Sequence, residues 1–269
     1  RGNEFDEIIG DETLTREKLF DTLKQHSLLW NSWGMEDTDL TFDELVNFIE
    51  KEQKRMVLSH GIRAESLDND GAFAEDKNSM DERLGKMDQR LQGTRGFHIQ
   101  TTYGTNLFMG MRHGERRWFK ENGEIRPGGW NNLPGGEIFT TPDEEDVNGV
   151  LVLPALQDEI TTHQGVDQLV YLTIRNGKIA KIDGGKSAGK LRRYLEECLK
   201  EEATTNIISV LQCAEIAFGA NSKARPTVAK PEGKYTDPAH PALETEKRLG
   251  TMHIAFGSTK HGEEGTEGH

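Results

Sequence analysis

Residues 169–182 read LVYLTIRNGKIAKI, and this stretch decides the class of fold. Apolar and β-branched side chains fill residues 169–174, as they do in a buried strand. Asn176-Gly177 suits a two-residue turn because both residues tolerate positive φ. Residues 178–182 then supply the returning strand. The stretch therefore predicts an antiparallel hairpin in the second half of the chain.

The segments around this hairpin predict short strands and helices. Turn signals at Asn122-Gly123 and Pro127-Gly128-Gly129 separate the alternating runs. The predicted strands cover residues 97–102, 107–112, 117–120, 150–153 and 252–256. Two helices are predicted after the hairpin, at residues 191–200 and 206–217. This order favours an α+β fold with an antiparallel or mixed sheet.

Residues 1–95 differ because their patterns are helical. Thr41-Phe42-Asp43-Glu44 is a capping box, in which two side chains satisfy free amides at a helix start. Core-facing positions at helical spacing are predicted for Met80, Leu84, Met87 and Leu91. We therefore expect a helical region at residues 1–95, followed at residues 96–269 by a β-rich domain with flanking helices.

The charge and hydropathy of the 269-residue chain exclude several functions. Its net charge of −13 disfavours binding to nucleic acid or to anionic lipid, both of which need a cationic surface. No apolar run approaches the roughly 20 residues of a membrane helix. No secretory signal is recognisable, so we expect a cytoplasmic protein. Cys198 and Cys213, both on predicted helices, form no CxxC pair and are expected to be reduced packing residues.

One glycine-rich segment resembles a phosphate-binding loop but lacks an essential group. Residues 184–191 read GGKSAGKL between a predicted strand and a predicted helix. A phosphate loop places Ser or Thr after its final lysine to bind magnesium, and here that residue is Leu191. We therefore favour an ordinary strand-to-helix turn over nucleotide binding.

Three other segments each place a polar side chain among apolar or small residues. Glu137 follows the Pro134-Gly135-Gly136 turn, which would fix it at the start of a strand. Glu215 lies in CAEIAFG at residues 213–219, and His253 lies in TMHIAFG at residues 251–257. Buried carboxylates need partners, and two glutamates with one histidine form a reasonable ligand set for a divalent metal. Taken singly, Glu137 is equally consistent with a surface turn, Glu215 with an ion pair, and His253 with a hydrogen-bonded core histidine.

Together these segments resemble the thermophilic-type metallo-aminopeptidases, the aminopeptidase T and aminopeptidase S group. That family surrounds its first metal glutamate with Asn-Leu/Met-Pro, two variable residues and Glu-Val/Ile-Phe-Thr. Residues 132–140 match this motif, with Glu137 in the ligand place. The family's second glutamate lies in a stretch similar to Ala214-Glu215-Ile216. Residues 246–253 resemble the approach to its metal histidine, here His253. The resemblance covers residues 97–269.

The sequence departs from the family pattern at several places. Asn106 replaces the aspartate of the usual Gly-Thr-Asp-Leu segment, and Lys260 stands where the family carries a metal-site tyrosine. No aspartate follows Asp237, so a later His-x-Asp pair is absent from these 269 residues. The part before residue 96 is shorter than in family members. We therefore expect residues 1–95 to be the remainder of a truncated N-terminal domain, and residues 96–269 to be the metal-binding domain.

The resemblance implies a metal-dependent hydrolase that removes N-terminal residues from small peptides. Glu137, Glu215 and His253 would bind zinc, cobalt or manganese, and the two glutamates would serve in catalysis. A homodimer is implied as well.

The same superfamily resembles the 2,5-dihydroxypyridine dioxygenases, which open an aromatic ring with one iron(II). The departures at Lys260 and in the missing His-x-Asp pair remove support for two metals. They favour this alternative, with a small-molecule substrate, or a relative without catalysis.

Overall fold

The computed structural model describes residues 16–25, 27–31, 42–59, 64–153, 169–205, 210–225 and 242–257. These residues belong to two compact units. The first contains residues up to 60 together with 124–133, and the second contains the rest. The division into domains at residues 95 and 96 stays a prediction.

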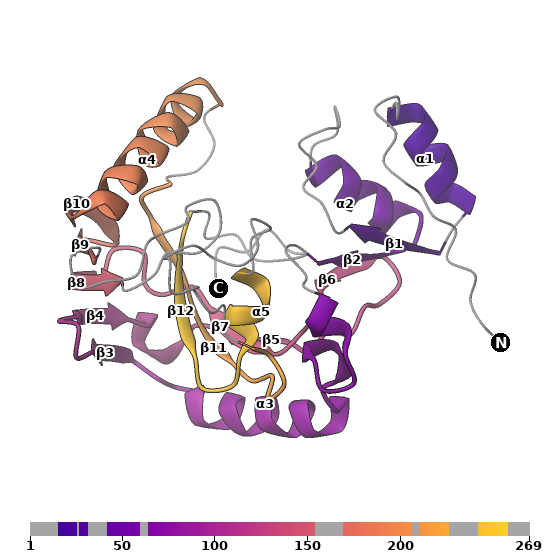
Figure 1. Ribbon diagram of the computed structural model, residues 1–269, viewed down its shortest axis with the longest axis horizontal. Helices are drawn as coiled ribbons and strands as arrows, with labels where there is room; N and C mark the ends of the chain where they lie inside the picture. Colours follow the sequence, from indigo (N-terminus) through magenta and orange to yellow (C-terminus); the bar gives the residue numbers. More distant parts are fainter. Residues whose placement is uncertain are drawn as a thin grey trace. The chain divides into compact units, whose positions relative to one another are not determined.

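The first unit is a parallel sheet with two helices (Figure 1). Its strands are β1 (Leu28–Asn31), β2 (Arg55–Leu58) and β6 (Gly129–Asn132), in the order β1-β2-β6. The helices are α1 (Arg16–Gln25) and α2 (Phe42–Lys51). The small core of this unit consists of Leu23, Leu45, Ile49, Met56 and Leu58. The expectation of a purely helical region before residue 96 was wrong, because short apolar runs such as Met56–Leu58 can be buried as strands. The predicted cap residue Thr41 lies outside the described residues.

The second unit contains a five-stranded antiparallel sheet in the order β10-β9-β8-β4-β3. Its strands are β3 (Gly96–Gln100), β4 (Asn106–Gly110), β8 (Val147–Leu153), β9 (Val170–Arg175) and β10 (Lys178–Gly184). The predicted hairpin is confirmed, and Asn176 and Gly177 adopt φ of 47° and 74° at its turn. Helix α4 (Lys186–Thr205) begins directly after β10, so the glycine-rich segment is a strand-to-helix turn.

The same unit contains a four-stranded antiparallel sheet in the order β12-β11-β7-β5. Its strands are β5 (Phe119–Glu121), β7 (Glu137–Thr140), β11 (Cys213–Gly219) and β12 (Met252–Phe256). The other helices of the unit are α3 (Lys77–Leu91) and α5 (Ala242–Lys247), with 3-10 turns η1 (Ala64–Leu67), η2 (Ala72–Ala74) and η3 (Arg112–Gly114).

The helix predicted at residues 206–217 was wrong where the structure describes it. Cys213 to Gly219 form the central strand β11, which is largely buried on both faces. A strand buried on both faces has no polar alternation and resembles a buried helix in sequence. Both Cys213 and Glu215 therefore lie on a strand.

The coarse expectation of a mixed helix-and-sheet protein is confirmed by three sheets with helices around them. Met80 and Leu84 of α3 lie in the main core, and Met87 and Leu91 pack against it, as predicted. None of the described helices is both long and apolar enough to cross a membrane.

Candidate metal centre

A tight turn positions Glu137 at the first residue of β7, as its sequence predicts. Gly136 has a φ of 126°, which favours glycine, and a Cβ there would lie 2.7 Å from Asn221 Cβ. Asn221 is buried, and its Nδ2 donates to the carbonyls of Ala72 at 3.0 Å and Gly135 at 2.9 Å. These two hydrogen bonds hold the turn against η2, and the turn thereby fixes where the Glu137 side chain leaves the backbone.

Small residues on β11 allow side chains of its two neighbouring strands to meet. Glu137 on β7 pairs with Gly219, and His253 on β12 pairs with Ala217. Positions 217 and 219 point to the same face because side chains alternate along a strand. A glycine and an alanine between the two longer residues leave room for contact above the central strand. Glu215 points to this face as well, two residues before Ala217.

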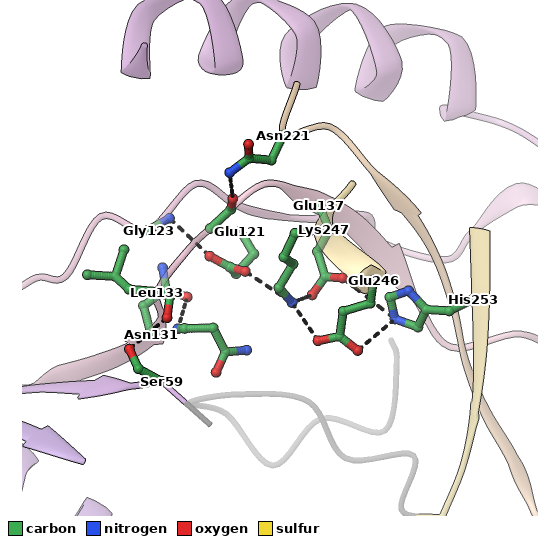
Figure 2. Close-up of polar contacts among 12 residues, drawn as sticks. Ser59, Glu121, Gly123, Asn131, Leu133, Glu137, Asn221, Glu246, Lys247 and His253 are labelled. Carbon is green, nitrogen blue, oxygen red and sulfur yellow. Dashed lines mark hydrogen bonds and ion pairs between the residues drawn. The ribbon is translucent and has the colours of Figure 1, made fainter. Parts of the chain in front are cut away.

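The structure brings the three predicted residues together. His253 Nε2 lies 3.0 Å from Glu215 Oε1 and 3.6 Å from Glu137 Oε2. A further carboxylate, Glu246 at the end of α5, places Oε2 3.9 Å from the same nitrogen. His253 Nε2 therefore faces three carboxylates, which come from two strands and a helix. Figure 2 shows two of them, Glu137 and Glu246, beside the imidazole.

Sequence reasoning missed three members of this cluster: Glu121, Glu246 and Lys247. The Lys247 side chain is 1% exposed, and its ammonium contacts Glu121 Oε2 at 3.2 Å, Glu246 Oε1 at 3.2 Å and Glu137 Oε1 (Figure 2). Glu121 is the cross-strand partner of Glu137. The run Glu246-Lys247-Arg248 looks like a solvated surface in sequence, and no local signal reveals that its middle residue is buried.

Burial and mutual charge change the proton affinity of this cluster. Burial raises the pKa of Glu121 to about 8, and the neighbouring Glu137 charge adds to this against the opposing effect of Lys247. Burial opposes the charge of Lys247, but Glu137, Glu246 and Glu121 outweigh it and hold its pKa well above the ordinary value. For His253 burial also favours the neutral form. The hydrogen bond to Glu215 and the charges of Glu137 and Glu246 outweigh burial, so the pKa of His253 is raised.

Several polar atoms of the cluster are buried without hydrogen-bond partners among the described residues. They are Glu121 Oε2, Glu137 Oε2 and His253 Nδ1. Glu121 Oε2 is compensated by the Lys247 ammonium at 3.2 Å, whereas an unsatisfied buried oxygen such as Glu137 Oε2 is costly and would be satisfied by a bound cation. The Glu137 oxygen is the informative atom, because it faces the imidazole nitrogen while its twin oxygen contacts Lys247.

The donor set fits a divalent metal in kind and approximate spacing. Two donors, each about 2.1 Å from a shared ion, lie about 3.0 Å apart at about 90° and about 3.6 Å apart at about 120°. The distances from His253 Nε2 to Glu215 and Glu137 match these values. As they stand, however, no three His, Cys, Asp or Glu side chains within the described ranges are arranged to hold a metal ion. The donors instead contact one another and Lys247.

Comparison with known proteins decides the family. The model of the NicX family, described as 2,5-dihydroxypyridine 5,6-dioxygenase, matches residues 9–267. The chain belongs to the NicX family. The expectation of a peptide-cleaving aminopeptidase, a hydrolase, was therefore wrong, and the ring-cleaving dioxygenase alternative is the better one. The resemblance of residues 132–140 to the aminopeptidase motif led to the wrong reaction class.

The NicX-family chain is similar to a 2,5-dihydroxypyridine 5,6-dioxygenase of Pseudomonas putida KT2440. The two are 29% identical over 107 residues, which is 39% of this chain and 30% of the relative. The solved structure of 2,5-dihydroxypyridine dioxygenase from the same strain superposes with a TM-score of 0.61 at 19% identity. It covers 86% of this chain and 60% of the solved one, so the chain spans well under two thirds of these relatives. AmpT from Thermus thermophilus matches at a TM-score of 0.43 and 16% identity, over 78% of this chain and 61% of AmpT.

Proposed function

We propose that this NicX-family chain binds one iron(II) ion and takes part in the oxygen-dependent opening of a dihydroxylated pyridine ring. The substrate class follows from the family, whose relatives are described as 2,5-dihydroxypyridine 5,6-dioxygenases. The observation that carries the proposal is the buried Glu137 Oε2. It lacks a hydrogen-bond partner among the described residues and faces His253 Nε2, which Glu215 also contacts.

We assign Glu137, Glu215 and His253 as the protein ligands of the ion. One imidazole and two carboxylates leave coordination positions for oxygen and substrate. The usual ligand set of a non-haem iron oxygenase, two histidines and one carboxylate, also has three protein ligands. When bound, iron(II) would supply the one-electron chemistry that lets dioxygen react with an aromatic ring. Lys260 lies outside the described residues and is not part of this assignment.

The residues of the chain have two tasks in this proposal. His253 must lose the proton on Nε2 before it can bind a cation, so metal binding would release that proton to solvent. In the metal-free protein the same nitrogen lies 3.0 Å from Glu215 Oε1, which keeps the imidazole facing the site. Glu137 Oε1 stays with Lys247, which holds the carboxylate in one orientation and directs Oε2 to the ion. The catalytic role that the sequence suggested for the two glutamates thus becomes ligation and orientation.

The test is anaerobic loading with iron(II), followed by an iron count per chain and oxygen uptake with 2,5-dihydroxypyridine. We expect one iron per chain, consumption of one dioxygen per ring opened, and no turnover of an aminoacyl anilide. Absence of iron binding, or bound iron without oxygen uptake, would count against the proposal. Homodimer formation, which light scattering would measure, and a cytoplasmic location stay predictions.

A further inference from the structure

Lys247 is a cation built into the acidic cluster. Its side chain is 1% exposed and is surrounded by Glu121, Glu137 and Glu246, of which the first two are also buried. Burying an ammonium is costly unless its charge is compensated, and three carboxylates provide more compensation than one ion pair requires. The arrangement is therefore more acidic than a structural salt bridge needs to be.

Two of these carboxylates connect Lys247 to the imidazole of the candidate metal centre. Glu137 contacts the ammonium through Oε1 and faces His253 Nε2 with Oε2 at 3.6 Å. Glu246 does the same, with Oε1 3.2 Å from the ammonium and Oε2 3.9 Å from the imidazole nitrogen. Each carboxylate thus has one oxygen for each of two neighbouring positive groups. Bridging carboxylates have this role in two-metal sites, where the ions lie about 3.5–4 Å apart.

We infer that the Lys247 ammonium takes the place of a second divalent cation and thereby limits this site to one metal ion. The carboxylates of Glu121, Glu137, Glu215 and Glu246 carry at most four negative charges, and the raised pKa of Glu121 lowers that number near neutral pH. The Lys247 ammonium and one divalent ion supply three positive charges, so a second divalent ion would give the cluster a net positive charge. The single ion is that of the proposed function, on which this inference rests; the position of Lys247 is independent of it.

The inference assigns Lys247 a positioning role that differs from simple stabilisation. A purely structural lysine, once replaced, would leave a less stable protein with the same capacity for metal. Replacing a lysine that occupies a cation position would leave a set of carboxylates able to bind one additional ion. The number of ions per chain separates the two roles without any measurement of activity.

The experiment loads the full chain with Mn²⁺, which is stable in air, and counts ions per chain by elemental analysis. The proteins are wild type, Lys247→Met, which keeps the length of the side chain without its charge, and Lys247→Arg, the matched control that keeps the charge. We expect one ion in wild type and in Lys247→Arg, and one additional ion in Lys247→Met. The additional ion should produce an exchange-coupled EPR spectrum in place of the six-line signal of an isolated Mn²⁺.

Glu121→Gln/Lys247→Met guards against a failure to fold, because it removes one unpaired carboxylate and keeps both bridging ones. The inference is overturned if the folded variants gain no ion, or if wild type already binds two. A wild type without metal, combined with one ion in Lys247→Met, would refute the single-iron function and leave the role of Lys247 standing. One Mn²⁺ ion in wild type without any gain in the folded variants would refute the role of Lys247 and leave the single-metal site standing.

Discussion

Glu75 and Glu137 are two carboxylates of the same compact unit that are almost equally buried, with side chains 5% and 6% exposed. Their surroundings differ. Glu75 Oε1 contacts Arg83, and its Oε2 accepts from Ser222 N at 2.9 Å, Ser222 Oγ at 2.6 Å and Lys223 N at 3.1 Å. Glu137 has one oxygen on Lys247, and its other oxygen has no hydrogen-bond partner among the described residues.

The difference teaches that burial alone does not identify a functional carboxylate. At Glu75 both carboxylate oxygens accept hydrogen bonds, so the group stabilises the fold and has no oxygen left for a ligand. At Glu137 an acceptor is directed to an imidazole without being satisfied, which is the condition under which a cation would be bound favourably. The four predictions below set these two carboxylates against each other.

The largest effect is expected for Glu137→Gln. The substitution keeps the shape of the side chain and removes its charge. Loss of a residue that only contacts a metal ligand lowers metal affinity roughly 10- to 100-fold, and loss of a ligand should lower it by more. Titration with Mn²⁺ followed by elemental analysis measures this loss. Unchanged metal content would contradict the assignment of Glu137 as a ligand.

The same variant should lose little stability. Lys247 keeps its contacts with Glu121 and Glu246, and repulsion between Glu121 and Glu137 is relieved. Urea denaturation of the metal-free protein should therefore show a smaller loss of unfolding free energy than Glu75→Gln does. This control separates a missing ligand from a damaged fold.

For Glu75→Gln we expect the opposite result. Arg83 would lose its partner and the backbone amides of Ser222 and Lys223 would lose a charged acceptor. Charge-assisted hydrogen bonds of this kind contribute about 1.5–3 kcal/mol each, and the amide oxygen of Gln recovers part of that. We expect a loss of about 2–3 kcal/mol in urea denaturation, with the Mn²⁺ count of the folded protein unchanged. A loss of metal binding at intact stability would reverse the roles assigned to Glu75 and Glu137.

The sequence predicts the three proposed ligands better than it predicts their surroundings. Glu137, Glu215 and His253 stand in short apolar or glycine-rich runs, where a charged group is conspicuous, and their convergence follows from the register of β7, β11 and β12. The burial of Lys247 cannot be predicted, because a lysine between charged neighbours has the same local pattern whether it is exposed or buried. Its burial depends on the contact of α5 with β11, which no local rule encodes.

The strands likewise include some that the sequence predicts and some that it does not. The β9–β10 hairpin is predictable because Asn176-Gly177 specifies its own turn. Strand β11 is not, because both of its faces are largely buried, which removes the alternation that would identify a strand. The Glu137 motif did not give the reaction class either, because its resemblance to the aminopeptidases led to the wrong family.

The pH dependence of stability sharpens the description of Glu75. Burial would raise the pKa of Glu75, but hydrogen bonds from Ser222 and Arg83 outweigh it and hold that pKa below the ordinary 4.5. A lowered pKa in the folded state gives stability that is complete above the unfolded-state pKa and is lost as the pH falls through the folded value. The difference in unfolding free energy between wild type and Glu75→Gln should therefore be constant above about pH 5.5 and narrow below about pH 4.5. A difference that widens on acidification would contradict this.

The smallest effect is expected for Ser222→Ala. It removes one donor to Glu75 Oε2 and leaves the backbone amides of Ser222 and Lys223 in place, so the loss should be about 0.5–1.5 kcal/mol. The matched control is Ser187→Ala at the start of α4, because the Ser187 hydroxyl is buried and makes no hydrogen bond within the described part of the chain. Its removal should be neutral or slightly stabilising in the same urea titration. Equal losses in the two variants would mean that the Ser222 hydroxyl contributes nothing specific. A hydrogen-bonded hydroxyl and a buried hydroxyl without a partner would then contribute equally to the unfolding free energy, contrary to the argument made for Glu75 and Glu137.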